Sequence, residues 1–420
     1  MQTGHAVIGA NYGDEGKGLM TDYLASRRGG DCLVVRFNGG AQAGHTVVAP
    51  DGRRHVFSHF GAGAFAGCPT LLSQFFIVNP LLFCREYKEL LDIGLHPVLS
   101  IHSRAYVTTP YDIFINQLIE RRRGRARHGS CGVGINETVT RCLRSSSLRT
   151  TAEDLLTPKK LFGKLMGLGR VWFLDRLAEH HVDTGSADVE AFVEKQELIM
   201  SQFIWDVESL LDVAEIRVDY PTAKRVIFEG AQGLMLDEFR IDQWPHLTRS
   251  RTGLANVTYL APKLQLDELK VTYVTRTYLT RHGAGPLAGE QDWTLPDATN
   301  VVNQFQGQLR FAPLDGRNLG DSISLDLAGA RRVFPQIEAD LAVTCVDQLN
   351  MPRGIDKCLP INYVSSGPTR ADVDFRCGGR GIGVGYSSRS GTSVVSAEAA
   401  KATGRPGPVR LPEARYVAMK

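Results

Sequence analysis

Short apolar segments that run directly into glycine-rich turns recur along this chain. Each segment is typical of a buried strand, and each turn follows where that strand would end: His5 to Ala10 before Asn11 to Gly18, Cys32 to Phe37 before Asn38 to Thr46, Arg225 to Phe228 before Glu229 to Gly233, and Lys270 to Val274 before a turn with Gly283 and Gly285. Helical patterns separate these strands. The order predicts an α/β fold with a large, mostly parallel central sheet flanked by helices, and a site at the carboxyl edge of that sheet.

Composition limits the classes of partner and compartment. The chain has 48 Lys and Arg against 45 Asp and Glu, and a net charge of +3 is too small to attract a nucleic acid or a membrane surface by itself. No run of eighteen apolar residues occurs, so we expect no membrane span. The eight cysteines form no CxxC pair and the N-terminus lacks a signal-peptide pattern, which together predict a reduced, cytoplasmic location.

The chain offers no internal repeat and no long linker. Strands with helices between them favour one large domain over residues 1–370. Residues 371–420 are rich in glycine and basic residues, and we expect a C-terminal extension there, of unknown role.

The first glycine turn, GDEGKG at 13–18, resembles a phosphate-binding P-loop without being one. The P-loop pattern would need glycine at position 11 and Ser or Thr at position 18, where the chain has Asn11 and Gly18. Glycines, a following helix and Lys17 would still favour an anion. The acidic pair Asp14 and Glu15 would repel phosphate unless a Mg²⁺ ion or a proton-transfer role compensates. A tight turn with a solvated acidic pair is the alternative interpretation.

Three further turns carry candidate ligand contacts. His45 follows a strand, Gln232 lies in FEGAQG with Thr248 beyond it, and Asp347 ends TCVD, where a carboxylate can accept the N–H groups of a guanine edge. Each also has an ordinary structural interpretation, as a packed histidine, a loop amide or a helix cap.

Taken in order, these blocks resemble the adenylosuccinate synthetase family. The resemblance is carried by MQTGHAVIGANYGDEGKGLMTDYLA, VVRFNGGAQAGHTVV, IFEGAQGLMLDEF, WPHLTRS and TRTYLTRHGAGPLAGE, and it returns at TCVD and VSSGP. It implies a GTP-binding fold and the reaction of IMP, L-aspartate and GTP to adenylosuccinate, GDP and phosphate, with Mg²⁺, in a homodimer.

The resemblance also implies roles for individual residues. Catalytic roles fall to Asp14, His45 and Gln232, and the expected metal shell contains Asp14 and the carbonyl of Gly44. The implied GTP site comprises Gly13, Glu15, Gly16, Lys17, Gly18, Gly44, Thr46, Asp347, Ser365, Ser366 and Gly367. The implied purine-monophosphate site comprises Asn38, Gln42, Ser130, Cys131, Arg141, Gln232, Thr248 and His282, with Arg141 near the position that the family contributes across a dimer interface. Arg310 and Arg317 are the candidates for binding the aspartate carboxylates.

Several positions depart from the family pattern, and they concern ligand recognition more than phosphoryl transfer. They are Ala41 and Gln42, Ser130 and Cys131, His282, and Cys345 in place of the usual lysine of TKLD. Two acceptors therefore stay open: IMP, and the guanylates used by phage-type relatives that make 2-aminoadenine precursors. The basic run from Arg121 to Arg127 leaves a third alternative, a non-catalytic nucleotide- or nucleic-acid-binding relative, which Asp14, Lys17, His45 and Gln232 argue against.

Overall fold

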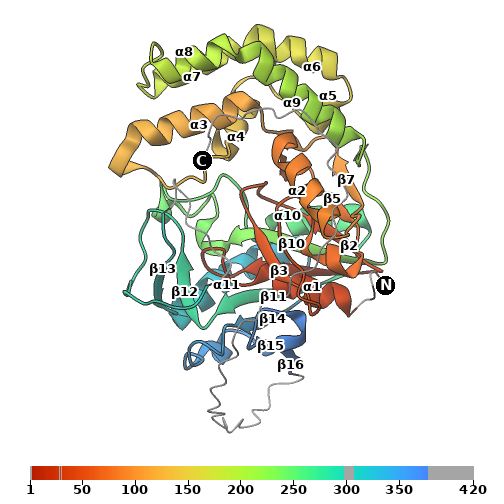
Figure 1. Ribbon diagram of the computed structural model, residues 1–420. Coiled ribbons are helices and arrows are strands. Elements are labelled where there is room, and N and C mark those ends of the chain that lie inside the picture. The colour runs from red at the N-terminus through yellow and green to blue at the C-terminus, as the bar shows by residue number, and fades with distance from the viewer. Residues whose placement is uncertain (1, 28, 30, 298–306, 377–420) are drawn as a thin grey trace, which may run out of the picture. The chain divides into compact units, whose positions relative to one another are not determined.

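The computed structural model describes residues 2–27, 29, 31–297 and 307–376, and the elements below lie within these ranges (Figure 1). Its main sheet has ten strands in the order β16-β15-β14-β11-β1-β10-β2-β5-β7-β9. In chain order these are β1 (Thr3–Gly9), β2 (Leu33–Arg36), β5 (Thr70–Leu72), β7 (Leu99–His102), β9 (Ala214–Arg217), β10 (Arg225–Gly233), β11 (Glu268–Arg276), β14 (Ile337–Thr344), β15 (Ile361–Ser365) and β16 (Val373–Phe375). Neighbours pair in parallel except β15 with β16. The predicted α/β fold is confirmed.

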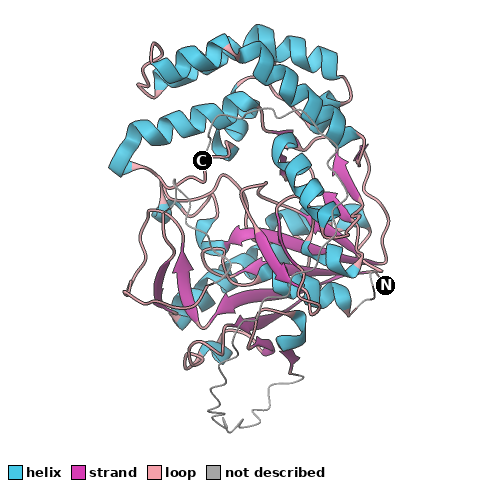
Figure 2. Cartoon of the chain, in the orientation of Figure 1, coloured by secondary structure: helices cyan, strands magenta, loops and turns pink. Residues whose placement is uncertain are grey.

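The central strands are apolar on both faces because helices cover both. Val7 of β1 packs under α1 (Lys17–Ser26), whereas Ala6 and Ile8 face a cluster that includes α10 (Ala255–Leu260) and α11 (Gly316–Arg331). Figure 2 shows the strands of the sheet with helices on either side. This burial on two faces explains why the strands are continuous apolar runs and show no alternation.

A separate helical layer, at the top of Figure 1, packs beyond β5 and β7 around one large apolar cluster. Its helices are α2 (Pro80–Asp92), α3 (Pro110–Arg123), α4 (Ile135–Arg144), α5 (Ala152–Leu155), α6 (Pro158–Lys164), α7 (Arg170–Glu179), α8 (Ala187–Glu194) and α9 (Gln196–Leu211). Three small pairs complete the described strands: β3 (His45–Val48) with β4 (Arg54–Phe57), β6 (Ile77–Val78) with β8 (Tyr106–Val107), and β12 (Tyr278–Arg281) with β13 (Arg310–Pro313).

The expected boundary between residues 370 and 371 falls inside a short 3-10 helix, η8 (Arg370–Asp372), that directly precedes β16. β16 pairs with β15, and Thr369 to Asp372 form a capping box just before it, so the sheet continues through residue 375. The remainder of the expected extension, 377–420, lies outside the described residues. Within the described ranges, no helix is long and apolar enough to cross a membrane.

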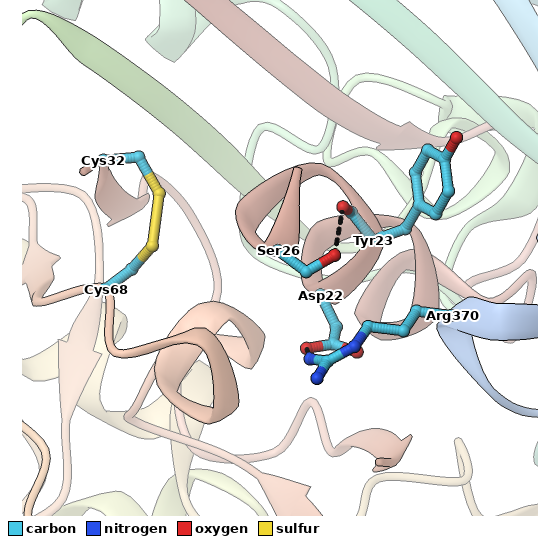
Figure 3. Close-up of a disulfide and its surroundings, with 6 residues drawn as sticks. All are labelled: Asp22, Tyr23, Ser26, Cys32, Cys68 and Arg370. Carbon is cyan, nitrogen blue, oxygen red and sulfur yellow. Dashed lines mark hydrogen bonds and ion pairs between the residues drawn. A yellow bond between two sulfur atoms is a disulfide. The ribbon is translucent and has the colours of Figure 1, made fainter. Parts of the chain in front are cut away.

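One covalent link was not predicted. Cys32 and Cys68 form a disulfide, with Cα atoms 5.5 Å apart, beside the C-terminal end of α1 (Figure 3). Val34 pairs with Thr70 in the sheet, and each cysteine lies two residues before one of them, so the register of β2 and β5 places the cysteines side by side. This bond is at odds with the expectation of a wholly reduced set of cysteines.

Candidate active site

The glycine turns converge because the strands that lead into them are parallel. The loops after β1, β2, β10, β11, β14 and β15 all leave the carboxyl edge of the sheet, where the polar residues singled out in the sequence gather. Gly16 and Gly18 lie at the start of α1, and Gly16 adopts a φ of 97°, a left-handed conformation that favours glycine. The N-terminus of a ten-residue helix therefore opens onto this edge.

The acidic pair divides into one buried and one accessible carboxylate. Glu15 is buried, and its Oε1 accepts the N–H groups of Asn11 and Gly13 at 3.0 and 2.7 Å. Its Oε2 lies 3.2 Å from the Nζ of Lys17, which also donates to the carbonyl of Gly13. Glu15 and Lys17 thus hold the loop from inside. Because Lys17 pairs with Glu15, the repulsion that two carboxylates would exert on a bound phosphate is reduced.

Asp14 is the carboxylate that remains available to a ligand. Its side chain is 26% exposed, and its Oδ2 lies 3.4 Å from the Nε2 of His282. Its backbone carbonyl accepts a hydrogen bond from the Nε of Arg276. The loop is therefore held by its backbone while the Asp14 carboxylate points out of it.

Gln232 is presented by a bulge in β10. The pairing of β1 with β10 shifts between Val7 and Gly9, so that Gly230, Ala231 and Gln232 protrude from the ladder. Gln232 has a φ of 61°, unusual for a residue other than glycine. Asn38 stabilises the bulge, since its side-chain amide donates to the carbonyl of Ala231 and accepts from its N–H group. Strained backbone of this kind concentrates at functional sites.

His45 forms a buried dyad with Glu229. The Nδ1 of His45 lies 2.6 Å from the Oε1 of Glu229, whose other oxygen accepts the N–H of Ala62. Burial lowers the pKa of His45 to about 4, although Glu229 acts in the opposite direction. At neutral pH the ring is therefore uncharged, Nδ1 carries the proton that Glu229 accepts, and Nε2 is the nitrogen left for a ligand.

Several buried polar atoms at this edge have no hydrogen-bond partner among the described residues. They are the Nε2 of His45, the Oε1 of Gln232, and both the Oε1 and the Nε2 of Gln42. Buried polar groups in proteins are normally hydrogen-bonded, so a cluster of such atoms indicates the place of a polar ligand.

The loops after β14 and β15 adjoin the first loop. The N–H of Val346 donates to the carbonyl of Ser365, which joins the two later loops. The Oγ1 of Thr344 donates to the carbonyl of Glu15 at 2.8 Å. Asp347 is exposed, Ser366 is exposed, and the Oγ of the buried Ser365 bonds to the carbonyl of Gly367. The predicted guanine contacts therefore lie in neighbouring loops at the same edge.

Two of the predicted purine contacts already bond to partners within the protein. Arg141 is 1% exposed, and its N–H groups bond to the carboxylate of Asp112, the carbonyls of Val107 and Leu148, and the hydroxyl of Thr150. All of its N–H groups are bonded inside the protein, so none is left for a ligand. Asn38 is fully buried, and its amide bonds to both the carbonyl and the N–H of Ala231, so it stabilises the bulge.

The other predicted contacts have mixed environments. Ser130 bonds to Asn116, and burial raises the pKa of the neighbouring Cys131 thiol to about 11, so that this thiol is neutral. Thr248 is buried, Gly44 is exposed directly before β3, and Thr46 is the half-buried second residue of that strand. 

The two predicted aspartate contacts differ in their engagement. Arg310 binds the carboxylate of Glu290 and the carbonyls of Gly283 and Gly285. Arg317 is exposed in the first turn of α11.

The basic run belongs mainly to the end of α3. Arg121 pairs with Asp188 at 2.9 Å, Arg123 pairs with Glu120 at 2.6 Å, and Arg122 donates to the carbonyl of His181. Cations also suit the negative end of a helix, so these three residues have a sufficient structural role.

The oxygen donors at this edge suit a magnesium ion shared with phosphates. Asp14 is an accessible carboxylate and Gly44 presents an exposed backbone. Across the described ranges, no group of three His, Cys, Asp or Glu side chains could hold a metal by itself. Mg²⁺ commonly takes one or two protein oxygens and completes its shell with phosphates and water, so these residues fit that ion.

Comparison with known proteins identifies the family. A family model described as adenylosuccinate synthetase matches residues 6–311, more than half of the chain. The chain belongs to the adenylosuccinate synthetase family. It is accordingly an adenylosuccinate synthetase-type ligase of the GTP-binding, purine-biosynthesis class.

The relatives are distant from this chain in sequence. The adenylosuccinate synthetase of Borrelia turicatae is 28% identical over 361 residues, which cover 86% of this chain and 80% of the relative. That of Neisseria meningitidis is 32% identical over 291 residues, which cover 68% of this chain and 64% of the relative.

Two solved structures share the fold. The fully ligated adenylosuccinate synthetase of Plasmodium falciparum has a TM-score of 0.59 and 18% identity, and the match covers 89% of this chain and 99% of that one. The succinoaminodeoxyadenylate synthetase of cyanophage S-2L, bound to dGMP and to dATP as an energy donor, has a TM-score of 0.55 and 14% identity, over 89% of this chain and 95% of that one.

Two residues that contact the candidate site were missed from the sequence. Glu229 stood within the quoted FEGAQG block, and its signal was a carboxylate in an otherwise apolar strand end. Arg276 lies at the end of β11 and contacts the loop of Asp14, which is 262 positions away in the chain. No local sequence pattern predicts a contact between residues so far apart in the chain.

Proposed function

We propose that this ligase joins L-aspartate to the 6-position of a purine nucleoside monophosphate through a 6-phosphoryl intermediate, with GTP as the phosphoryl donor. The observation that carries the proposal is the separation of roles within the acidic pair. Glu15 pairs with Lys17 inside the loop, whereas Asp14 stays accessible at the sheet edge where Gln42, Gln232 and His45 have unpartnered atoms.

The chemistry gives Asp14 its role. The 6-oxo group of a purine leaves poorly, so it has to be phosphorylated before an amine can displace it. Asp14 takes the proton from N1, electron density moves to O6, and O6 attacks the γ-phosphorus while the β–γ bridging oxygen leaves with GDP. Gln232 orients Asp14 and the purine, and Thr248 binds the phosphate of the nucleotide.

His45 acts on the phosphoryl group in transfer. Glu229 binds Nδ1 of its ring, so Nε2 is the nitrogen left for a ligand. The negative charge of a triphosphate would favour the protonated ring, which then donates to phosphoryl oxygen. Mg²⁺, held by Asp14 and the carbonyl of Gly44, would supply neutralisation of the phosphate charge.

The second step uses the amine of aspartate. Its nitrogen attacks C6, the C6–O6 bond breaks, and inorganic phosphate leaves with O6. Arg317 is exposed and is the more available clamp for the aspartate carboxylates, while Arg310 supports the loop of Gly283 and Gly285. Asp347, with Ser365, Ser366 and Gly367, binds the guanine of GTP.

IMP is the proposed acceptor, and GMP or dGMP is the alternative. The alternative is supported by the fold shared with the cyanophage enzyme, which was solved with dGMP, and by Gln42, Cys131 and His282. Retention of Asp14 supports IMP. A homodimer and a cytoplasmic location are part of this proposal, whereas the pairing of Arg121 and Arg123 with carboxylates weakens a nucleic-acid-binding role.

The test is an acceptor panel. Purified protein is incubated with Mg²⁺, L-aspartate and GTP together with IMP, GMP or dGMP, and the succinylated nucleotide is quantified by mass spectrometry. We expect product with IMP, formed about 10²–10⁴-fold more slowly by Asp14→Asn. Product only with a guanylate would replace IMP as the acceptor, and no product with any purine would overturn the proposed function.

A further inference from the structure

Arg276 occupies the point at which three segments of the site meet. It ends β11, is 8% exposed, and spreads its guanidinium over three partners. Its Nε donates to the carbonyl of Asp14, its Nη1 to the hydroxyl of Tyr278 at 3.0 Å, and its Nη2 to the carboxylate of Asp297 at 3.0 Å. A planar group with five N–H donors suits such a junction, and a lysine at this position cannot reproduce it.

The first segment is the loop that carries Asp14. Its neighbour Glu15 is tied at the backbone by Thr344, so Arg276 and Thr344 hold two consecutive carbonyls of this loop. The side chain of Asp14 has no comparable brace on the loop itself, because the internal brace belongs to Glu15 and Lys17. Arg276 therefore holds the backbone from which this carboxylate extends, and His282, 3.4 Å from its Oδ2, is a side-chain contact of the carboxylate.

The second segment contains Tyr278 and the third contains Pro296 and Asp297. The side chain of Gln348 links the two. The hydroxyl of Tyr278 donates to the Oε1 of Gln348 at 2.5 Å, and the Nε2 of Gln348 donates to the carbonyl of Pro296 at 3.1 Å. Gln348 directly follows Asp347, the proposed guanine contact. The side chain of Asp297 is 9% exposed, so its ion pair with Arg276 is buried.

We propose that Arg276 is a positioning residue that sets the Asp14 loop in register with the nucleotide-base loop at 345–348. This role rests on the proposed function, in which Asp14 is the base and Asp347 binds guanine. Loss of the guanidinium would remove the donor to the Asp14 carbonyl and break the buried ion pair with Asp297, and both loops would relax.

The first test needs no substrate. Amide hydrogen exchange of the full chain is compared between wild type and Arg276→Gln. We expect exchange in segments 13–16 and 345–348 to rise by about tenfold, with the sheet strands β1 and β10 unchanged. Unchanged exchange in both segments would overturn the proposal, whether or not the protein is active.

The second test is kinetic and includes a conservative variant and a control. We expect kcat with the best acceptor to fall by about 100-fold in Arg276→Gln, because small misplacements of a reacting group have effects of that size. Arg276→Lys, which keeps the charge beside Asp297, should recover part of the loss. Arg217→Lys on the exposed pair with Glu215 is the control and should retain wild-type kcat.

These outcomes separate the inference from the function on which it rests. Absence of turnover in wild type would overturn the proposed function. The hydrogen-exchange result would then decide by itself whether Arg276 positions the loops. Full activity in Arg276→Gln would overturn the positioning role. If Arg276→Gln does not fold, Gln348→Ala replaces it, and raised exchange in 345–348 with a raised KM for GTP is then the supporting result, while wild-type values of both would contradict it.

Discussion

At the scale of single residues, the site depends on giving two adjacent carboxylates different surroundings. Glu15 accepts two backbone N–H groups and pairs with Lys17, whereas Asp14 keeps an accessible side chain. Environment rather than residue type thus gives Glu15 a structural role and leaves Asp14 available for the chemical role proposed above. The sequence shows the pair but not which member turns inward, because both orientations satisfy the same motif.

Substitution of each member should therefore affect a different property. Asp14→Asn is expected to lower kcat by about 10²–10⁴-fold with little change in Tm, since a general base contributes on that order. Glu15→Gln is expected to cost about 3–5 kcal/mol of unfolding free energy, because Lys17 would be left as a buried, unpaired charge. Steady-state kinetics and denaturant unfolding of both variants measure the contrast, and the reverse assignment of effects would contradict it.

Asp22, on the buried side of α1, gives a prediction about pH. Burial raises its pKa from 3.8 to about 6, although its pair with Arg370 at 2.9 Å acts in the opposite direction (Figure 3). The folded state then binds the proton more tightly than the unfolded state, so the stability that Asp22 contributes is present below about pH 4 and is lost as pH rises through 6.

The measurement is the difference in unfolding free energy between wild type and Asp22→Asn. We expect wild type to lose up to about 3 kcal/mol relative to the variant between pH 4 and pH 7, with the other titrating groups common to both proteins. A constant difference across that range, or one that favours wild type as pH rises, would contradict this interpretation.

At the scale of elements, sequence patterns predicted the strands well and the contacts between them poorly. The apolar runs at 5–10 and 270–274 became β1 and β11, and Pro110 to Arg122 became α3, since local propensity and burial agree there. Glu229 with His45 and Arg276 with Asp14 could not be predicted, because these pairs depend on which strands are neighbours in the sheet. The disulfide between Cys32 and Cys68 could not be predicted for the same reason.

The disulfide should stabilise the joined elements β2 and β5. It closes a loop with a sequence separation of 36, for which the chain-entropy model gives about 4 kcal/mol. Denaturant unfolding of the oxidised protein and of the same protein after dithiothreitol should show a loss of about 2–4 kcal/mol on reduction, with kcat retained because both cysteines lie at the opposite end of their strands from the site.

The control for reduction is Cys32→Ala/Cys68→Ala. Dithiothreitol should leave its stability unchanged. Equal stability of oxidised and reduced wild type, or detection of both thiols in the untreated protein, would show that the bond contributes nothing.

At the scale of the whole molecule, the site is assembled from loops that are distributed over most of the described chain. Parallel strands bring residues 14, 45, 232, 276 and 347 to one edge, and helices on both faces keep that edge rigid. The ordered motifs predicted this convergence. They did not predict that Arg141 and Asn38 would be used for internal packing, because a motif records a residue type and not its hydrogen-bond partners.

The measurement that tests the central claim most directly follows the purine oxygen. Wild-type protein is supplied with Mg²⁺, GTP, L-aspartate and IMP labelled with ¹⁸O at the 6-position, and the inorganic phosphate is analysed by mass spectrometry. Attack of O6 on the γ-phosphate predicts one ¹⁸O atom in the phosphate for each succinylated nucleotide formed, and labelled phosphate formed about 10²–10⁴-fold more slowly with Asp14→Asn. Succinylated product accompanied by unlabelled phosphate would contradict the 6-phosphoryl route.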